Sequence, residues 1–157
     1  MIVMTPKSLL RHKRCVSSKA AFMNGSTVHR VLLEDRSMDM SVRKDAKRVV
    51  LCTGKVYYDL LEEREQRGLD HVHLVRVEQL YPFPSIALAE EMESFKHCEF
   101  VWCQEEPANM GAWQFVRDLF AWDGASTRRP AASPATGSLQ RHKAEQQAVV
   151  DSALGRS

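Results

Sequence analysis

Apolar-rich runs alternate with segments of helical periodicity from residue 47 onward, and this alternation constrains the fold more than any other feature of the chain. The apolar runs cover residues 49–52, 71–77 and 100–103. Runs of this kind are typical of strands that are covered on both faces. The segments between them, 55–67 and 85–95, place apolar residues at helical spacing. Strand–helix–strand units pair their strands in parallel through right-handed crossovers, so we predict an α/β fold with three layers, a mostly parallel sheet flanked by helices.

A single domain is expected, because 157 residues fall within the usual size of one domain. We divide residues 1–157 into an N-terminal edge segment and loop (1–46), an alternating strand and helix core (47–122), an irregular connection (123–138), and a terminal helix and tail (139–157). Within the first part, 2–4 and 28–33 are candidate short strands, and 35–45 is expected to be an exposed loop. Residues 123–138 are dense in Gly, Ala, Ser, Thr and Pro, which favours irregular structure. A further amphipathic helix is predicted from Trp113 to Phe120.

The charge balance and the cysteines narrow the class of protein. The chain has 22 Lys and Arg against 20 Asp and Glu, a formal net charge of +2, which offers no general attraction for nucleic acid or anionic lipid. No stretch approaches the roughly 18 apolar residues of a membrane-spanning helix. The four cysteines form no Cys-x-x-Cys pair. We therefore expect no nucleic-acid or membrane partner, and reduced, structural cysteines in a reducing compartment.

No catalytic, cofactor-binding or metal-ligating residue is predicted. Thr53-Gly54-Lys55 lies between a strand and a helix, but it lacks the further glycines and the hydroxyl of a phosphate-binding loop. The six histidines form no His-x-x-x-His or His-Glu-x-x-His pattern.

The most unusual segment follows the run at 100–103 and begins with Gln104, Glu105 and Glu106. It lies at the carboxyl end of a predicted strand, where ligands bind in open α/β sheets. In one interpretation a glutamate caps a neighbouring helix and Asn109 starts the next one. In the other, these carboxylates contact a ligand or a subunit. Both interpretations stay open on the sequence.

Five motifs, in order and at matching spacing, resemble one family: MTPKSLLRH (4–12), CTGKVYYDL (52–60), RVEQLYPFP (76–84), WCQEEP (102–107) and ASPATG (132–137). On these motifs the chain resembles the C-terminal domain of the thiamine-diphosphate-dependent decarboxylating (first) component of 2-oxoglutarate dehydrogenase. The resemblance implies a transketolase C-terminal-like fold at the end of a much longer polypeptide. Thiamine diphosphate, magnesium and the catalytic histidines would belong to the preceding domains. The chain would then be a fragment, an oxidoreductase by family but inactive alone.

The same resemblance implies the activity and partners of the intact enzyme. It would decarboxylate 2-oxoglutarate on thiamine diphosphate and pass succinyl to a lipoyl carrier in the tricarboxylic acid cycle. Its partners would be the preceding domains or a companion subunit, a second copy in a homodimer, and the lipoyl succinyltransferase. The bacterial cytoplasm and the mitochondrial matrix both suit the family. A related 2-oxoadipate dehydrogenase shares these motifs and stays open as an alternative.

The chain departs from the family pattern in two places. The stretch between the predicted helix at Trp113 and the ASPATG motif is shorter than usual. Some members bind an acyl-coenzyme A or adenine nucleotide through basic residues after the Pro-x-Pro turn, where this chain has the sequence Ser-Ile-Ala at 85–87. Candidate effector or interface contacts are Arg30, Gln79, Gln104, Glu105 and Glu106. A stand-alone nucleotide- or acyl-CoA-binding or subunit-interaction module, without catalysis, is therefore a second hypothesis.

Overall fold

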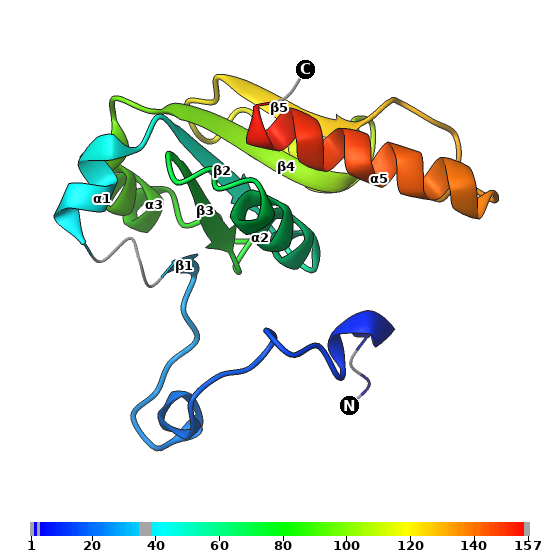
Figure 1. Cartoon of the computed structure of the whole chain (residues 1–157). Helices are drawn as coiled ribbons and strands as arrows, with labels where there is room; N and C mark the ends of the chain where they lie inside the picture. Colours follow the sequence, from blue (N-terminus) through cyan, green and yellow to red (C-terminus); the bar gives the residue numbers. More distant parts are fainter. Residues whose placement is uncertain (1, 3, 35–38, 156–157) are drawn as a thin grey trace.

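The sheet has five strands in the order β1-β3-β2-β4-β5 in a computed structural model, which describes residues 2, 4–34 and 39–155 (Figure 1). The strands are β1 (Val31–Leu33), β2 (Arg48–Cys52), β3 (Val72–Val77), β4 (Glu99–Pro107) and β5 (Gly124–Arg128). The helices are α1 (Met40–Asp45), α2 (Val56–Gln66), α3 (Ser85–Met92), α4 (Trp113–Val116) and α5 (Leu139–Leu154), with short 3-10 turns at Lys7–Leu9, Lys19–Phe22 and Glu93–Phe95. β2, β3, β4 and β5 pair in parallel, and β1 pairs antiparallel to β3. The predicted mostly parallel α/β sheet is confirmed.

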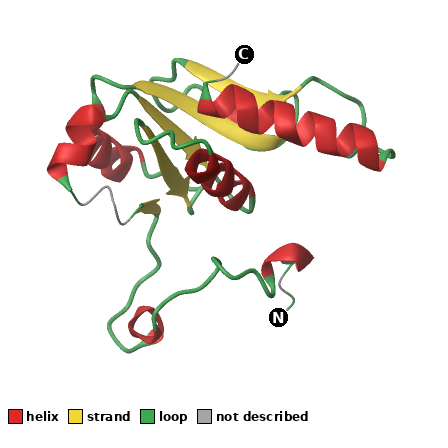
Figure 2. Cartoon of the chain, viewed as in Figure 1, coloured by secondary structure: helices red, strands yellow, loops and turns green. Residues whose placement is uncertain are grey.

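Side chains of successive strand residues point to opposite faces of the sheet. Helices cover both of these faces (Figure 2). Val49 and Leu51 of β2 pack with α3 and α4 in one buried cluster. Val50 and Cys52 pack with α2 and α5 in the other. The three layers predicted from the alternation are therefore present. None of the helices among the described residues is long and apolar enough to cross a membrane.

The irregular connection predicted at 123–138 is corrected, since it begins with strand β5. Gly, Ala, Ser and Thr gave this segment the composition of a loop. The strand forms because β4 offers a parallel partner and because its only inward hydroxyl is satisfied: Ser126 is buried and donates to the carbonyl of Val149 in α5 at 2.7 Å. Pairing and burial thus outweigh the weak strand propensity of small residues.

Three smaller expectations also change. The exposed loop predicted at 35–45 is corrected in its described part, where Asp39 caps α1 by accepting a hydrogen bond from the backbone amide of Ser41 at 2.8 Å. The strand predicted at 28–33 shortens to β1, and the one at 2–4 includes residue 3, outside the described residues. The helix expected from Trp113 to Phe120 reduces to the single turn α4.

Residues before β1 form an arm that runs away from the sheet (Figure 1). Its best-defined contact is with α2, where Arg14 pairs with Glu65 at 2.7 Å and the ring of His12 lies 4.9 Å from that of Tyr58. Beyond this contact, large apolar side chains of the arm are exposed, among them Phe22 and Val28.

Candidate functional site

The carboxyl edge of the sheet contains the point at which the chain changes direction across it. β2 lies between β3 and β4, so the chain crosses to one side after β2 and to the other after β3. Ligands of open α/β sheets bind in the crevice at such a point. At this point of the sheet the ammonium of Lys55 donates to the carboxylate of Glu105. Gln146 of α5 also donates to Glu105, at 3.0 Å, and to Asp59 of α2, at 2.9 Å. Glu105 is thus held by groups of its own domain.

Gln104 has a structural role in the loop after β4. It is buried, and its Oε1 accepts hydrogen bonds from the indole of Trp102 at 3.2 Å and the backbone amide of Trp113 at 2.8 Å. Its Nε2 donates to the carbonyls of Glu106, Pro107 and Met110, at 3.3, 3.2 and 2.8 Å. One amide side chain therefore closes the loop at both ends, and it has no donor left for an effector.

Gly111 fits against this side chain because it has none of its own. Its φ of +67° lies in the left-handed region, which favours glycine. A Cβ at this position would lie 3.0 Å from Nε2 of Gln104 and 3.0 Å from Cβ of Glu106. Gln104 and Gly111 thus close a tight loop.

The expectation that Asn109 starts the next helix is wrong, because α4 begins at Trp113 and the side chain of Asn109 bonds the backbone of Ala131 instead. Glu105 pairs with Lys55 and caps none of the helices among the described residues.

The five candidate contacts fall into two separate groups. Arg30 and Gln79 lie together, since the carbonyl of Arg30 accepts hydrogen bonds from the backbone amides of Glu78, at 2.9 Å, and Gln79, at 3.2 Å. The side chain of Gln79 donates to the carbonyl of Pro82 at 2.6 Å. This group lies beside β1 and β3, and β2 stands between it and the group at β4. The structure therefore does not unite the candidates into one site.

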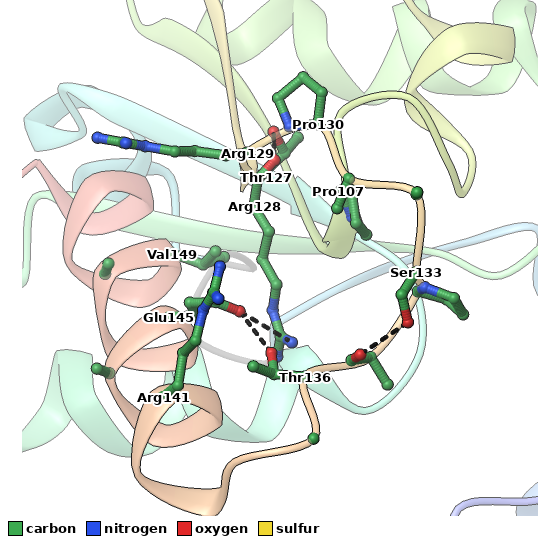
Figure 3. A pocket seen from close by; sticks show the side chains of 17 residues that line it. Pro107, Thr127, Arg128, Arg129, Pro130, Ser133, Thr136, Arg141, Glu145 and Val149 are labelled. Carbon is green, nitrogen blue, oxygen red and sulfur yellow. Dashed lines mark hydrogen bonds and ion pairs between the residues drawn. The ribbon is translucent and has the colours of Figure 1, made fainter.

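Sequence reasoning missed a cavity of about 970 Å³ between β5, the segment 129–137 and α5 (Figure 3). One wall is the segment 129–137, which contains the ASPATG motif and is fixed at two points. The side chain of Asn109 donates a hydrogen bond to the carbonyl of Ala131 at 2.9 Å and accepts one from the backbone amide of Ala131 at 3.1 Å. Thr136 donates to Glu145 of α5 at 2.7 Å. The one signal in the sequence was this motif itself, lying directly before the terminal helix.

Arg128, the last residue of β5, brings a buried charge to this cavity. Its Nη2 donates to Oε1 of Gln146 at 2.8 Å and lies 3.3 Å from Nδ1 of His142. Its Nη1 reaches Glu145 at 3.7 Å. Glu145 also accepts from Arg141 at 2.7 Å, and the hydrogen bonds from Thr136 and Arg141 hold the pKa of its carboxyl below the ordinary range.

The described residues do not fit a site for thiamine diphosphate and magnesium. Magnesium prefers carboxylate oxygens, and among residues 2, 4–34 and 39–155 no three His, Cys, Asp or Glu side chains gather closely enough to hold a metal ion. Lys55 in the turn after β2 is engaged by Glu105. We therefore derive no step through that cofactor from this chain.

Comparison with known proteins gives a consistent family. The family model described as 2-oxoglutarate dehydrogenase C-terminal matches residues 16–154. Proteins named 2-oxoglutarate dehydrogenase E1 component from Brucella abortus (strain S19) and Brucella ovis (strain ATCC 25840 / 63/290 / NCTC 10512) are each 52% identical to this chain over 172 residues. These matches cover 99% of this chain and 17% of each relative, so the chain spans about a sixth of the length of the relatives.

A solved structure described as a split gene transketolase, an inactive beta4 tetramer, aligns with 69% of this chain and 38% of its own. The TM-score is 0.48 and the sequence identity is 14%.

Proposed function

The chain belongs to the 2-oxoglutarate dehydrogenase C-terminal family, and from this membership we propose that it serves as the C-terminal domain of an E1 component. In the intact enzyme the substrate is 2-oxoglutarate, which is decarboxylated on thiamine diphosphate, and the succinyl group passes to a lipoyl carrier. The cofactor supplies the carbanion chemistry, and protein groups supply binding and orientation. Thiamine diphosphate and magnesium belong to the remainder of the enzyme in this proposal.

One observation carries the proposal. The alignment has 52% identity and covers 99% of this chain but only 17% of the length of the relative. The 172 aligned residues of the relatives exceed the 157 residues of this chain, so at least 15 of them have no counterpart here. This agrees with the shortened stretch expected before the ASPATG motif.

The role that the fold supports is packing against the rest of the enzyme. Tyr81 after β3 and Phe115 of α4 are 82% and 43% exposed, and their rings lie 6.3 Å apart. Ile86, in the first turn of α3, is 78% exposed. Exposed apolar patches on a soluble domain mark interaction surfaces. We assign Tyr81 and Phe115, called the apolar patch below, and separately the exposed Ile86 of α3, to contact with the remainder of the E1 component.

The assembly and its place in the cell follow from the same premise. The proposed partners are the remaining domains of the same enzyme, a second copy of it, and the lipoyl succinyltransferase. The relatives named above come from bacteria, which supports the bacterial cytoplasm as the place of action.

Two measurements test this function. The purified chain, supplied with thiamine diphosphate and Mg²⁺, is expected to release no CO₂ from 2-oxoglutarate, and turnover would contradict the division of roles. The chain is also expected to bind the Brucella abortus E1 component from which the matching region has been removed. Phe115→Ser in the apolar patch should weaken that binding, whereas Leu139→Ser, at an exposed leucine of α5, should leave it unchanged. Equal binding by both variants would remove the patch from the proposal.

A further inference from the structure

We propose that the cavity between β5, the segment 129–137 and α5 binds a small organic anion, a molecule with an apolar body and one phosphate or carboxylate group. This inference concerns the described residues of the chain alone and does not depend on the E1 assignment. It stands on a buried guanidinium, on the charge of the cavity lining, and on the way in which the wall is built.

The buried guanidinium is that of Arg128. Its side chain is 8% exposed and runs from the end of β5 toward Thr136 and Glu145 (Figure 3). The Nε–H is buried and has no hydrogen-bond partner. The 3.7 Å between Nη1 and Glu145 exceeds hydrogen-bond distance. A buried donor without an acceptor destabilises the folded chain, and an anionic oxygen of a ligand would be a strong acceptor for it.

The lining of the cavity carries a positive balance. The lining contains Arg128, Arg129 and Arg141 but a single carboxylate, that of Glu145, and the side chain of Arg129 points away from that carboxylate (Figure 3). That carboxylate is already engaged by Arg141 and by the hydroxyl of Thr136, both at 2.7 Å. The guanidinium groups together therefore exceed the negative charge available to them, which favours an anion and disfavours a cation.

The remaining wall suits an apolar body. Alanines and prolines of the segment 130–135, with Val149 of α5, supply most of it. The segment is held by Asn109 at one end and by Thr136 at the other. A cavity of about 970 Å³ lies at the upper end of the range for small-molecule sites, which are mostly apolar with a few fixed polar groups.

The test is calorimetric titration of the full chain with three probes that share a phenyl body: phenyl phosphate, 4-phenylbutyrate and the uncharged 4-phenyl-1-butanol. We expect one anion, or both, to bind at one site, and the alcohol to bind at least about tenfold more weakly. Which anion binds distinguishes a phosphate ligand from a carboxylate ligand. Binding of the alcohol as tight as that of the anions overturns the proposal, as does no binding by either anion.

Variants locate the site. Arg128→Met should abolish binding, but the loss of a buried charge can also unfold the chain. Arg141→Gln is therefore the decisive variant, because the side chain of Arg141 is 72% exposed. We expect Arg141→Gln to weaken binding about tenfold. The control is Arg117→Gln, an arginine beside α4 with 56% exposure that should not matter. In NMR spectra, the Nε–H resonance of Arg128 and the amide of Thr136 should shift on addition of the bound anion. Unchanged affinity in Arg141→Gln, or shifts confined to other parts of the chain, would refute the site.

Discussion

At the scale of single residues, Gln104 organises the carboxyl edge of the sheet. Gln104→Ala removes the acceptor for two donors and the donor for three carbonyls inside a buried loop. We expect a loss of about 2–4 kcal/mol in the free energy of unfolding. Urea denaturation measures it, with Gln114→Ala on the exposed side of α4 as control. A loss in Gln104→Ala no larger than that in the control would show that the amide does not hold the loop.

Gly111 and Gly54 form a matched pair for testing close approach. Both have positive φ, +67° and +76°, so alanine at either position meets the same backbone penalty, about 1 kcal/mol. Only at Gly111 would the new Cβ lie 3.0 Å from other atoms, whereas Gly54 has nothing within 4 Å. Gly111→Ala should therefore destabilise the chain by at least about 1 kcal/mol more than Gly54→Ala. Equal losses of stability would contradict the close contact with Gln104.

The cysteines are expected to differ in reactivity. All four are free, with Cys15 exposed and Cys52, Cys98 and Cys103 buried. Burial raises the pKa of Cys52 to about 12 and raises that of Cys103. One thiol of the native chain should react rapidly with a disulfide reagent near pH 8, and the other three only on unfolding. Fast reaction of two or more thiols in the native state would contradict this burial.

The same shift predicts a pH dependence of stability. An unfolded thiol ionises near pH 9, whereas folded Cys52 stays protonated until about pH 12. Between these pH values Cys52 keeps its proton in the folded state and loses it in the unfolded state. The contribution of Cys52 to stability is therefore fully present below about pH 9 and falls as the pH rises toward 12. Cys52→Ala should flatten this decline. An equally steep decline in that variant would assign it to other groups.

At the scale of elements, Asn109 joins the loop after β4 to the wall of the cavity. Asn109→Ala removes both hydrogen bonds to Ala131, at 2.9 and 3.1 Å. We expect faster amide hydrogen exchange at Ala131 and a loss of about 1–2 kcal/mol in stability. Exchange at the amides of β2, far from this contact, serves as the internal control. Unchanged exchange at Ala131 would mean that the wall is held by other contacts.

The elements that sequence reasoning predicted are those whose burial shows as a local pattern of apolar side chains. β2 is a row of apolar residues and α2 an amphipathic stretch, so both were placed within a residue or two. β5 was missed because its stability comes from pairing with β4, which no local pattern reports. α4 was overestimated, because Phe120 and Trp122 turn back to pack at 4.9 Å in an aromatic cluster instead of continuing a helix.

The candidate site was predictable in part for the same reason. The topology implied by the alternation places the residues after β2 and β4 at one edge, and Lys55 does meet Glu105 there. Distances between groups on non-adjacent strands could not be read from the chain, so Arg30 was grouped with residues that lie across β3 and β2 from it. The cavity depends on a segment fixed by Asn109 and Thr136, contacts that span 22 and 9 residues.

At the scale of the whole molecule, a small sheet with two buried faces carries apolar surface that its own chain does not cover. The apolar patch and the arm before β1 both expose large side chains, Tyr81 and Phe22 being 82% and 79% exposed. The matching region makes up 17% of the relatives. These facts agree with the proposed place of this chain as one domain of a larger E1 component.

The most direct test is a chimera in which this chain replaces the matching region of the Brucella abortus E1 component. We predict that the chimera decarboxylates 2-oxoglutarate within about tenfold of the parent enzyme, while the parent without this region is inactive. Mass photometry establishes that the chimera assembles as the parent does. A correctly assembled chimera without activity, or full activity in the parent lacking the region, would contradict the proposal that this chain is the C-terminal domain of an E1 component.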